Sequence, residues 1–228
     1  MSDTERPVLR RFRTALVTGG ASGIGAAAVE LLETEGIEAR SLDLSTGFDV
    51  GDPAAWEAVE PADFAFLNAG VATGTLELTE LGDDDYRRAL GANVDGVVFG
   101  TRRMAQVMEP GSAIVATASL AGLVAMPFDP VYTLTKHAVV GFVRAVAPQL
   151  SERGIAINAL CPGFADTPIV DPVLREWIAD RSIPLIPAET VAAAALAVAR
   201  SGETGQAWVV QPGREPIVYQ FRGVPGPR

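Results

Sequence analysis

Thr18-Gly-Gly-Ala-Ser-Gly-Ile-Gly25 is the stretch that decides the fold, because it joins an apolar run to a helical pattern. The apolar run, Thr14–Thr18, predicts a strand. A strand, a glycine turn and a helix start, in this order, are the context in which a nucleotide pyrophosphate binds. Gly19 permits the tight turn, Gly23 lets the backbone approach the pyrophosphate, and Gly25 lets the helix pack closely on the strand. The alternative is an ordinary glycine-rich turn.

Short apolar runs alternate with helical segments along the rest of the chain, as is typical of βαβ units and a parallel sheet. The further runs are Ile37–Asp43, Phe64–Asn68, Ser112–Ala118, Ala156–Cys161 and Ala207–Val210. Helices are expected over Gly23–Glu35, Asp84–Met108, Val131–Glu152 and Ala188–Arg200. The sequence therefore predicts an α/β fold with one doubly wound, Rossmann-type parallel sheet, helices on both faces, and a single domain over residues 1–228.

Three segments fall outside this alternation. Residues 1–13 carry several arginines and are expected to form an N-terminal arm. Residues 164–186 have no clear period and are expected to form a substrate lid, because long connections in compact domains are often functional. Residues 211–228 are rich in proline and glycine and predict a C-terminal surface tail.

The composition argues against several classes of protein. Acidic residues outnumber basic ones by 28 to 18, so the surface is expected to repel nucleic-acid phosphates. The single cysteine, Cys161, permits no intrachain disulfide, and no cluster suggests a metal site. Val191–Ala199, the longest apolar helical stretch, is far short of the ~20 residues that a membrane span needs. We therefore expect a cytoplasmic protein with no nucleic-acid, membrane or metal partner.

Asp43 ends the second predicted strand, 18 residues after Gly25. A carboxylate at this place can accept hydrogen bonds from the adenosine ribose and repels a 2′-phosphate. The prediction is therefore NAD rather than NADP. A loop-capping aspartate is the alternative, and the nearby cation of Arg40 complicates the argument.

The glycine spacing and the motifs that follow resemble the classical short-chain dehydrogenase/reductase family, over nearly the whole chain. Ser119 precedes Tyr132-x-x-x-Lys136 at the family's 13-residue spacing, and Leu67 replaces the first Asn of the family's Asn-Asn-Ala-Gly. The resemblance implies a catalytic tetrad of Asn93, Ser119, Tyr132 and Lys136. It also implies cofactor contacts from Gly19, Ser22, Gly23, Ile24, Gly25, Asp43, Asp49, Val50, Asn68, Ala69, Gly70, Tyr132, Lys136, Pro162, Gly163 and Thr167.

Tyr132 and Lys136 are four residues apart in a predicted helix, so they share one face. Lowering the pKa of a tyrosine from about 10 to about 7 needs roughly 4 kcal/mol. One ammonium about 4 Å away supplies on the order of 4 kcal/mol at an effective dielectric constant near 20. We therefore expect Lys136, the only lysine among 18 basic residues, to lower the pKa of Tyr132. The alternatives are a Tyr packed over a Lys stem and, for Asn93, a surface helical position.

The resemblance implies an NAD(H)-dependent oxidoreductase that interconverts a secondary alcohol and a ketone, with Tyr132 as general acid/base. The alternatives are a non-catalytic dinucleotide-binding or regulatory protein on the same fold, and an NADPH-dependent acyl ketoreductase. Apolar residues in 120–128 and 164–186 favour an apolar substrate. In the family the two long helices pair between subunits, which implies a homodimer or homotetramer.

The chain departs from the family between the second and third strands. Only Leu44–Phe48 separates Asp43 from Asp49, where the family has a whole helix. We expect this helix to be reduced or missing, which leaves one flank of the sheet thinly covered. Either a partner chain or the C-terminal tail covers this flank, or the adenine pocket is more open than usual.

Overall fold

The strands form one sheet in the computed structural model, which describes residues 10–75 and 77–223. The strand order is β2-β1-β3-β4-β5-β6-β7, with all neighbours parallel except the antiparallel pair β6 and β7. The chain crosses from β2 over β1 to β3, which makes the carboxyl ends of β1 and β3 a switch point where ligands bind in such sheets. The strands are β1 Thr14–Thr18, β2 Glu38–Leu42, β3 Phe64–Leu67, β4 Ala113–Thr117, β5 Ala156–Pro162, β6 Ala207–Val210 and β7 Ile217–Val218.

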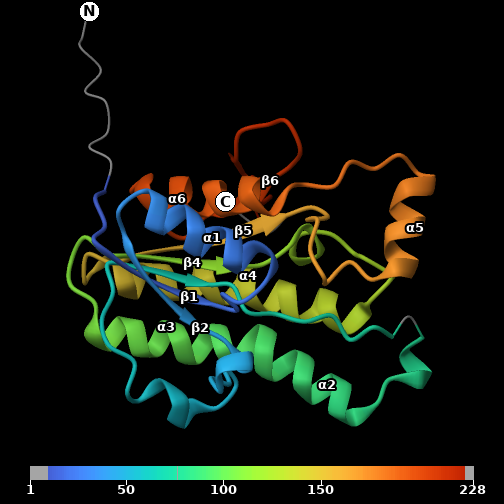
Figure 1. The fold of residues 1–228 in the computed structure, drawn as a ribbon, viewed down its shortest axis with the longest axis horizontal. Coiled ribbons are helices and arrows are strands. Elements are labelled where there is room, and N and C mark those ends of the chain that lie inside the picture. Colours follow the sequence, from blue (N-terminus) through green and yellow to red (C-terminus); the bar gives the residue numbers. More distant parts are fainter. Residues whose placement is uncertain (1–9, 76, 224–228) are drawn as a thin grey trace, which may run out of the picture.

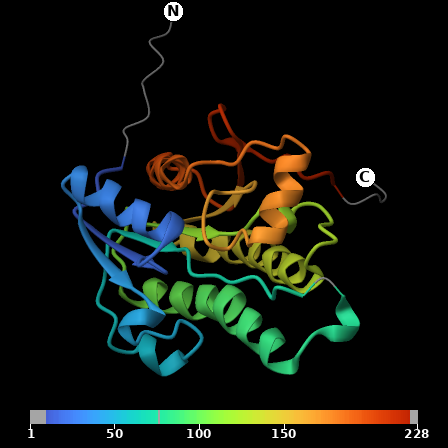
Figure 2. The same ribbon diagram turned by 45° about the vertical axis from the view of Figure 1, so that its right-hand side comes forward.

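Helices cover both faces of this sheet, as predicted (Figure 1). On one face lie α1 and α6, and on the other lie α3 and α4, as the turned view also shows (Figure 2). Phe64 and Phe66 of β3 point into the core under α1 and α6, whereas Ala65 and Leu67 point into the core under α3 and α4. A strand buried on both faces needs an uninterrupted apolar sequence, which explains the runs in the sequence. The helices are α1 Gly23–Thr34, α2 Asp83–Leu90, α3 Gly96–Val107, α4 Pro130–Ser151, α5 Pro172–Asp180 and α6 Ala188–Arg200.

The two ends of the chain differ in part from the prediction. Residues 1–9 and 224–228 lie outside the described structure, whereas Arg10 donates to the carbonyl of Gly111 at 3.2 Å and so holds its part of the arm against the body. The expected tail, 211–228, is not only a tail, because it contains β7, which pairs with β6. A two-residue strand is too short to show a period, so no sequence pattern predicts it.

The segment expected as one helix over residues 84–108 is interrupted. It consists of α2, a π-helical turn over Gly91–Asp95, and α3. The wider turn inserts a residue into the helical ladder and turns Asn93 inward, where it is fully buried. Within 164–186 the sequence prediction missed α5, although Asp171-Pro172 is a typical helix start.

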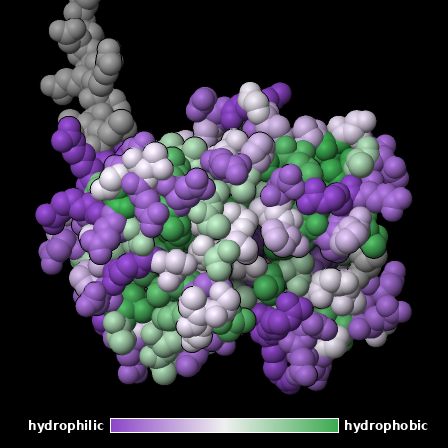
Figure 3. Space-filling model, viewed as in Figure 1, coloured by the Kyte–Doolittle hydropathy of each residue, from purple (hydrophilic) through white to green (hydrophobic). Residues whose placement is uncertain are grey.

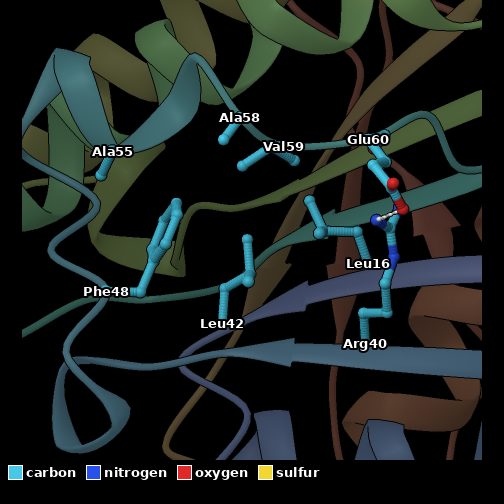
Figure 4. Close-up of a pocket in the computed structure, with 8 residues that line it drawn as sticks. All are labelled: Leu16, Arg40, Leu42, Phe48, Ala55, Ala58, Val59 and Glu60. Carbon is cyan, nitrogen blue, oxygen red and sulfur yellow. Dashed lines mark hydrogen bonds and ion pairs between the residues drawn. The ribbon is translucent and has the colours of Figure 1, made fainter.

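No α-helix joins β2 to β3, as expected. The connection contains only two 3₁₀ turns, Leu44–Thr46 and Pro53–Trp56. Beside them lies an open groove of about 320 Å³, lined by Leu16, Arg40, Leu42, Phe48, Ala55, Ala58, Val59 and Glu60 (Figure 4). None of the predicted catalytic residues lines it. The C-terminal tail does not cover it within residues 211–223, because β7 lies at the opposite edge of the sheet from β2.

Hydrophilic and hydrophobic side chains are interspersed over the face shown in Figure 3. Among the described residues, no helix is long and apolar enough to cross a membrane.

Trp56 fastens the shortened connection to the core. Its side chain is 2% exposed, and its indole N–H donates to the carbonyl of Val50 at 2.9 Å. The ring of Phe48 meets it edge-on at a centroid distance of 5.2 Å. A Cβ on Gly100 of α3 would lie 2.7 Å from the indole ring, so α3 must have glycine there to come this close. Trp56 thereby fixes the position of Val50 beside the switch point.

Replacing Trp56 therefore tests how the connection is stabilised. We expect Trp56→Ala to lower the free energy of unfolding by about 3–5 kcal/mol, because it leaves a large cavity. Trp56→Phe keeps most of the ring and loses the hydrogen bond, so a loss of roughly 1–3 kcal/mol is expected. Urea unfolding measures both. Equal losses in the two variants would show that volume at this position does not determine stability.

Candidate active site

The glycine loop and the end of β3 meet at the switch point. Gly19 has a φ of +67°, and a Cβ there would lie 2.9 Å from Cα of Ala69. A Cβ on Gly25 would collide with the carbonyl oxygen of Gly19. Two of the three predicted glycines are therefore required by the close approach of backbone to backbone.

The start of α1 has the form of an anion site. Ser22 occupies the N-cap position, but its side chain makes no capping hydrogen bond. Because the first N–H groups of a helix have no partner within the helix, they remain for a ligand. Gly23 has a φ of +52°, and a Cβ there would lie 3.1 Å from the methyl group of Thr167. Thr167 is buried, so the start of the predicted lid lies directly over the glycine loop. This cradle fits the pyrophosphate of a dinucleotide.

Asp43 contacts both the glycine loop and its own turn. One carboxylate oxygen accepts from the backbone N–H of Ala21 at 3.1 Å, and the other accepts from the Ser45 hydroxyl at 2.7 Å and its N–H at 2.9 Å. The Ser45 side chain is the main cause that lowers the pKa of Asp43. The loop-capping alternative is therefore realised, and it places the carboxylate beside the predicted ribose position.

Arg40 is directed away from this position. Its guanidinium donates to the carbonyls of Glu60 and Pro61 at 2.9 and 2.6 Å and pairs with the Glu60 carboxylate at 3.3 Å (Figure 4). With its donors engaged at the far end of the groove, Arg40 is not placed to attract a 2′-phosphate near Asp43.

Asn68 ties together the ends of three strands. The backbone N–H groups of Asn68 and Ala69 donate to the Thr18 hydroxyl at 2.9 and 3.0 Å. The Thr117 hydroxyl of β4 donates to the Asn68 side-chain oxygen at 3.1 Å. Sequence reasoning missed Thr18 and Thr117 because nothing in the local pattern distinguishes them from other strand threonines.

Lys136 is buried at the end of β4. It is 2% exposed, and its ammonium donates to the carbonyl of Thr117 at 2.8 Å. Nζ lies 5.4 Å from the centroid of the Tyr132 ring. A Cβ on Gly70 would be 3.3 Å from Nζ, so the end of β3 also borders the ammonium. Burial lowers the pKa of Lys136 to about 8.

Tyr132 and Ser119 form the reactive pair. Ser119 follows β4, and its hydroxyl accepts from the N–H of Ala121 at 3.1 Å and lies close enough to the Tyr132 side chain to act on its pKa. Burial raises the pKa of Tyr132 to about 12, the charge of Asp129 acts in the same direction, and the Ser119 hydroxyl opposes both. The expectation of a lowered Tyr132 pKa is therefore wrong for the protein without ligand. Burial penalises the phenolate more than its surroundings stabilise it.

The Asn93 side chain is buried and binds backbone and side-chain groups of two other segments. Its side-chain oxygen accepts from the N–H of Val71 at 2.8 Å, and its amide donates to the carbonyl of Val71 at 2.9 Å and to the Thr135 hydroxyl at 3.0 Å. Thr135 in turn donates to the carbonyl of Tyr132 at 2.7 Å. The alternative of a surface asparagine is wrong, because the π-helical turn directs this side chain inward.

The remaining predicted cofactor residues surround the same end of the sheet. Val50 packs against Gly96, where a Cβ would lie 2.8 Å from its methyl group, and the Asp49 carboxylate accepts from the N–H of Gly51 at 2.8 Å. Pro162 ends β5, and Gly163 donates to the carbonyl of Val210 at 3.1 Å. Ile24 is partly buried against the core between α1 and the sheet. No cluster of metal-ligating side chains occurs among the described residues.

Known proteins share this arrangement. A family model described as enoyl-(acyl carrier protein) reductase matches residues 52–214. A 15-hydroxyprostaglandin dehydrogenase (NAD(+)) of Mus musculus is 32% identical over 72% of this chain and 71% of its own length. The chain belongs to the short-chain dehydrogenase/reductase family.

Solved structures of this family have the same fold. A short-chain dehydrogenase/reductase of Brucella melitensis superposes with a TM-score of 0.79 at 24% identity, covering 88% of this chain and 96% of that one. A short-chain dehydrogenase of Burkholderia cenocepacia in complex with NADP has a TM-score of 0.74 at 25% identity, covering 91% and 99%. The chain is thus an NAD(P)-dependent oxidoreductase of this family, in which one relative is named for NAD(+) and another was solved in complex with NADP.

The buried ammonium gives a prediction about stability. The pKa of Lys136 is about 8 in the folded chain and near its ordinary 10.5 in the unfolded chain. The unfolded state therefore holds the proton more tightly, and folding with a charged Lys136 costs on the order of 3 kcal/mol below pH 8. This cost fades as the pH rises from 8 to 10.5. We expect Lys136→Met to raise the free energy of unfolding at pH 7 by about 2 kcal/mol. This gain is smaller than the full cost of the buried charge, because the Thr117 carbonyl loses its hydrogen-bond donor.

Urea unfolding of both proteins at pH 7 and pH 10 measures this difference. We expect the advantage of Lys136→Met to shrink at the higher pH. An advantage that is the same at both pH values would mean that the ammonium is not destabilised by burial.

Proposed function

We propose that this protein is an NAD(H)-dependent dehydrogenase that interconverts a secondary alcohol and a ketone, with Tyr132 as general acid/base. The observation that carries the proposal is the phenol of Tyr132, close enough to Ser119 for the hydroxyl to act on its pKa, beside the buried ammonium of Lys136 at the sheet end that holds the glycine loop. A buried, charged lysine destabilises the fold. A non-catalytic dinucleotide-binding protein has no need of such a residue.

The side chains divide the proton chemistry between them. When bound, the dinucleotide carries the hydride, and its oxidised form adds a positive charge to the site. In reduction, Ser119 orients the ketone oxygen and the phenol of Tyr132 donates its proton to that oxygen. In oxidation, the phenolate of Tyr132 takes the hydroxyl proton, and the ammonium of Lys136 stabilises that phenolate. The pKa of about 12 keeps the phenol protonated in the free enzyme, which suits the acid role.

NAD is the proposed cofactor because of the charge at the end of β2. The Asp43 carboxylate lies beside the glycine loop, and Arg40 is engaged by Glu60. A 2′-phosphate would therefore meet a negative charge without a compensating cation. The net charge of −10 also argues against an acyl ketoreductase, because an acidic carrier would be repelled.

An apolar alcohol or ketone is the proposed substrate class, with residues 164–186 as its lid. Trp177 of α5 contacts Phe128 edge-on at a centroid distance of 4.4 Å and lies 6.3 Å from Phe164. Arg175 of α5 pairs with Asp166 at 2.8 Å and fastens the helix to the segment after β5. Aromatic side chains therefore connect the lid to the loop that precedes the catalytic helix.

We also propose that the enzyme is a homodimer or homotetramer that pairs through α2, α3 and α4. Tyr86 on α2 and Leu134 on α4 are 39% and 51% exposed, which supports contact with another subunit. The unpaired Cys161 suits the reducing cytoplasm, which is the proposed compartment.

Tyr132 and Lys136 are tested by substitution. We expect Tyr132→Phe to lower kcat by about 10²–10⁴-fold, because it removes the proton donor. Lys136→Arg keeps the charge but replaces a compact ammonium with a wide planar group, so it should also lose most activity. Hydride transfer from a panel of secondary alcohols to NAD⁺ is followed by nicotinamide absorbance, and NADH fluorescence checks that binding remains. Turnover of Tyr132→Phe at the wild-type rate would overturn the mechanism.

Cofactor choice is tested by binding. We expect NADH to bind more tightly than NADPH, and Asp43→Asn to reduce this preference at least about tenfold by removing the repulsion. Asparagine retains an acceptor for the Ser45 turn, so the loop is preserved. A preference for NADPH in the wild-type protein would favour the acyl ketoreductase. Tight NADH binding without turnover on any alcohol would favour the non-catalytic alternative.

A further inference from the structure

Asp129 joins the catalytic helix to the loop that follows β3. It is the N-cap residue of α4, and one carboxylate oxygen accepts from the N–H of Tyr132 at 2.8 Å. The other oxygen accepts from the N–H of Thr73 at 2.7 Å. A single side chain therefore holds the turn that carries Tyr132 and a residue 56 positions earlier in the chain.

The loop over residues 71–75 is held at two points. Asn93 binds both backbone groups of Val71, and Asp129 binds the N–H of Thr73. The Thr73 hydroxyl accepts from the N–H of Thr75 at 3.2 Å, which extends the ordered region. Both clamps begin on elements that carry predicted catalytic residues, but only the clamp at Asp129 brings a charge.

That charge has no cationic partner among the ion pairs of the described residues. The ammonium of Lys136 is bonded to the Thr117 carbonyl and faces the Cys161 thiol of β5, whose pKa burial raises to about 12. The groups that act on Tyr132 are thus the Asp129 carboxylate and the Ser119 hydroxyl, with the Lys136 ammonium one helical turn further on. An unneutralised carboxylate at the start of the helix disfavours a phenolate.

We propose that Asp129 is a positioning residue that fixes the 71–75 loop to the catalytic turn and that its charge disfavours the phenolate form of Tyr132. Its two bonds to backbone N–H groups provide the first effect, and its uncompensated charge provides the second. The inference rests on the proposed role of Tyr132. It adds that the Asp129 carboxylate influences the ionisation of the Tyr132 phenol.

The experiment measures the phenol directly. The chain has three tyrosines, so protein labelled with 3-fluorotyrosine gives three fluorine resonances, and Tyr132→Phe identifies that of Tyr132. Its titration is compared in the wild type, Asp129→Asn and Asp129→Ser, all without dinucleotide. Asparagine and serine are good N-cap residues, so α4 keeps its cap. The matched control is Asp52→Asn, because Asp52 is also an aspartate that caps a turn before proline.

We expect the Tyr132 resonance to titrate about half a unit to one unit lower in Asp129→Asn and Asp129→Ser, and unchanged in Asp52→Asn. Identical Tyr132 shifts in the wild type and the Asp129 variants, at every pH below unfolding, would overturn the electrostatic role. An equal shift in Asp52→Asn would show that net charge rather than position is responsible, and would overturn it as well.

The positioning role has its own measurement. Hydrogen exchange at the Thr73 amide should be about tenfold faster in Asp129→Ser, because the short side chain keeps the cap but cannot reach both N–H groups. In the Asp52→Asn control, the Thr73 amide should exchange at the wild-type rate. Unchanged protection of Thr73 in Asp129→Ser would refute the clamp. Neither readout requires turnover, so a protein without alcohol activity would contradict the proposed function while leaving both results intact.

Discussion

The active end of the molecule depends on one buried ammonium. Lys136 donates to the Thr117 carbonyl from a position almost closed to water. Backbone comes close to this ammonium: a Cβ on Gly70 would lie 3.3 Å from its Nζ. A charge in so weakly screened a position acts strongly on nearby groups. The fold therefore tolerates a local loss of stability in order to hold a cation beside a phenol.

Burial acts on the two members of this pair in opposite directions. It raises the pKa of Tyr132 to about 12 and lowers that of Lys136 to about 8, so both effects favour the uncharged forms. An added positive ligand charge favours the phenolate and disfavours a second ammonium nearby. The ionisation of the pair is therefore coupled to what occupies the crevice, and binding at the glycine loop becomes part of the proton chemistry.

Local sequence patterns were sufficient for the parts of the site that depend on neighbours in the chain. The glycine loop, the apolar strands and the spacing of Tyr132 and Lys136 all follow from short-range rules, and the structure places them at one sheet end. The contact between Asp129 and Thr73 spans 56 positions, so no local sequence pattern predicts it. The direction of the Tyr132 pKa was missed for the same reason, because burial is a sum over distant elements. The strand β7 and the helix α5 were missed because they are short and mostly exposed.

The strand β2 forms one edge of the sheet. Within the described residues β2 pairs only with β1, so one side of its backbone faces outward with its donors and acceptors unmatched (Figure 1). Such a rim can template the addition of a strand from another molecule, which leads to aggregation. The strand is only five residues long and carries Glu38 and Arg40, features that discourage such pairing. Polar residues on a short border strand thus protect this protein from strand-to-strand aggregation.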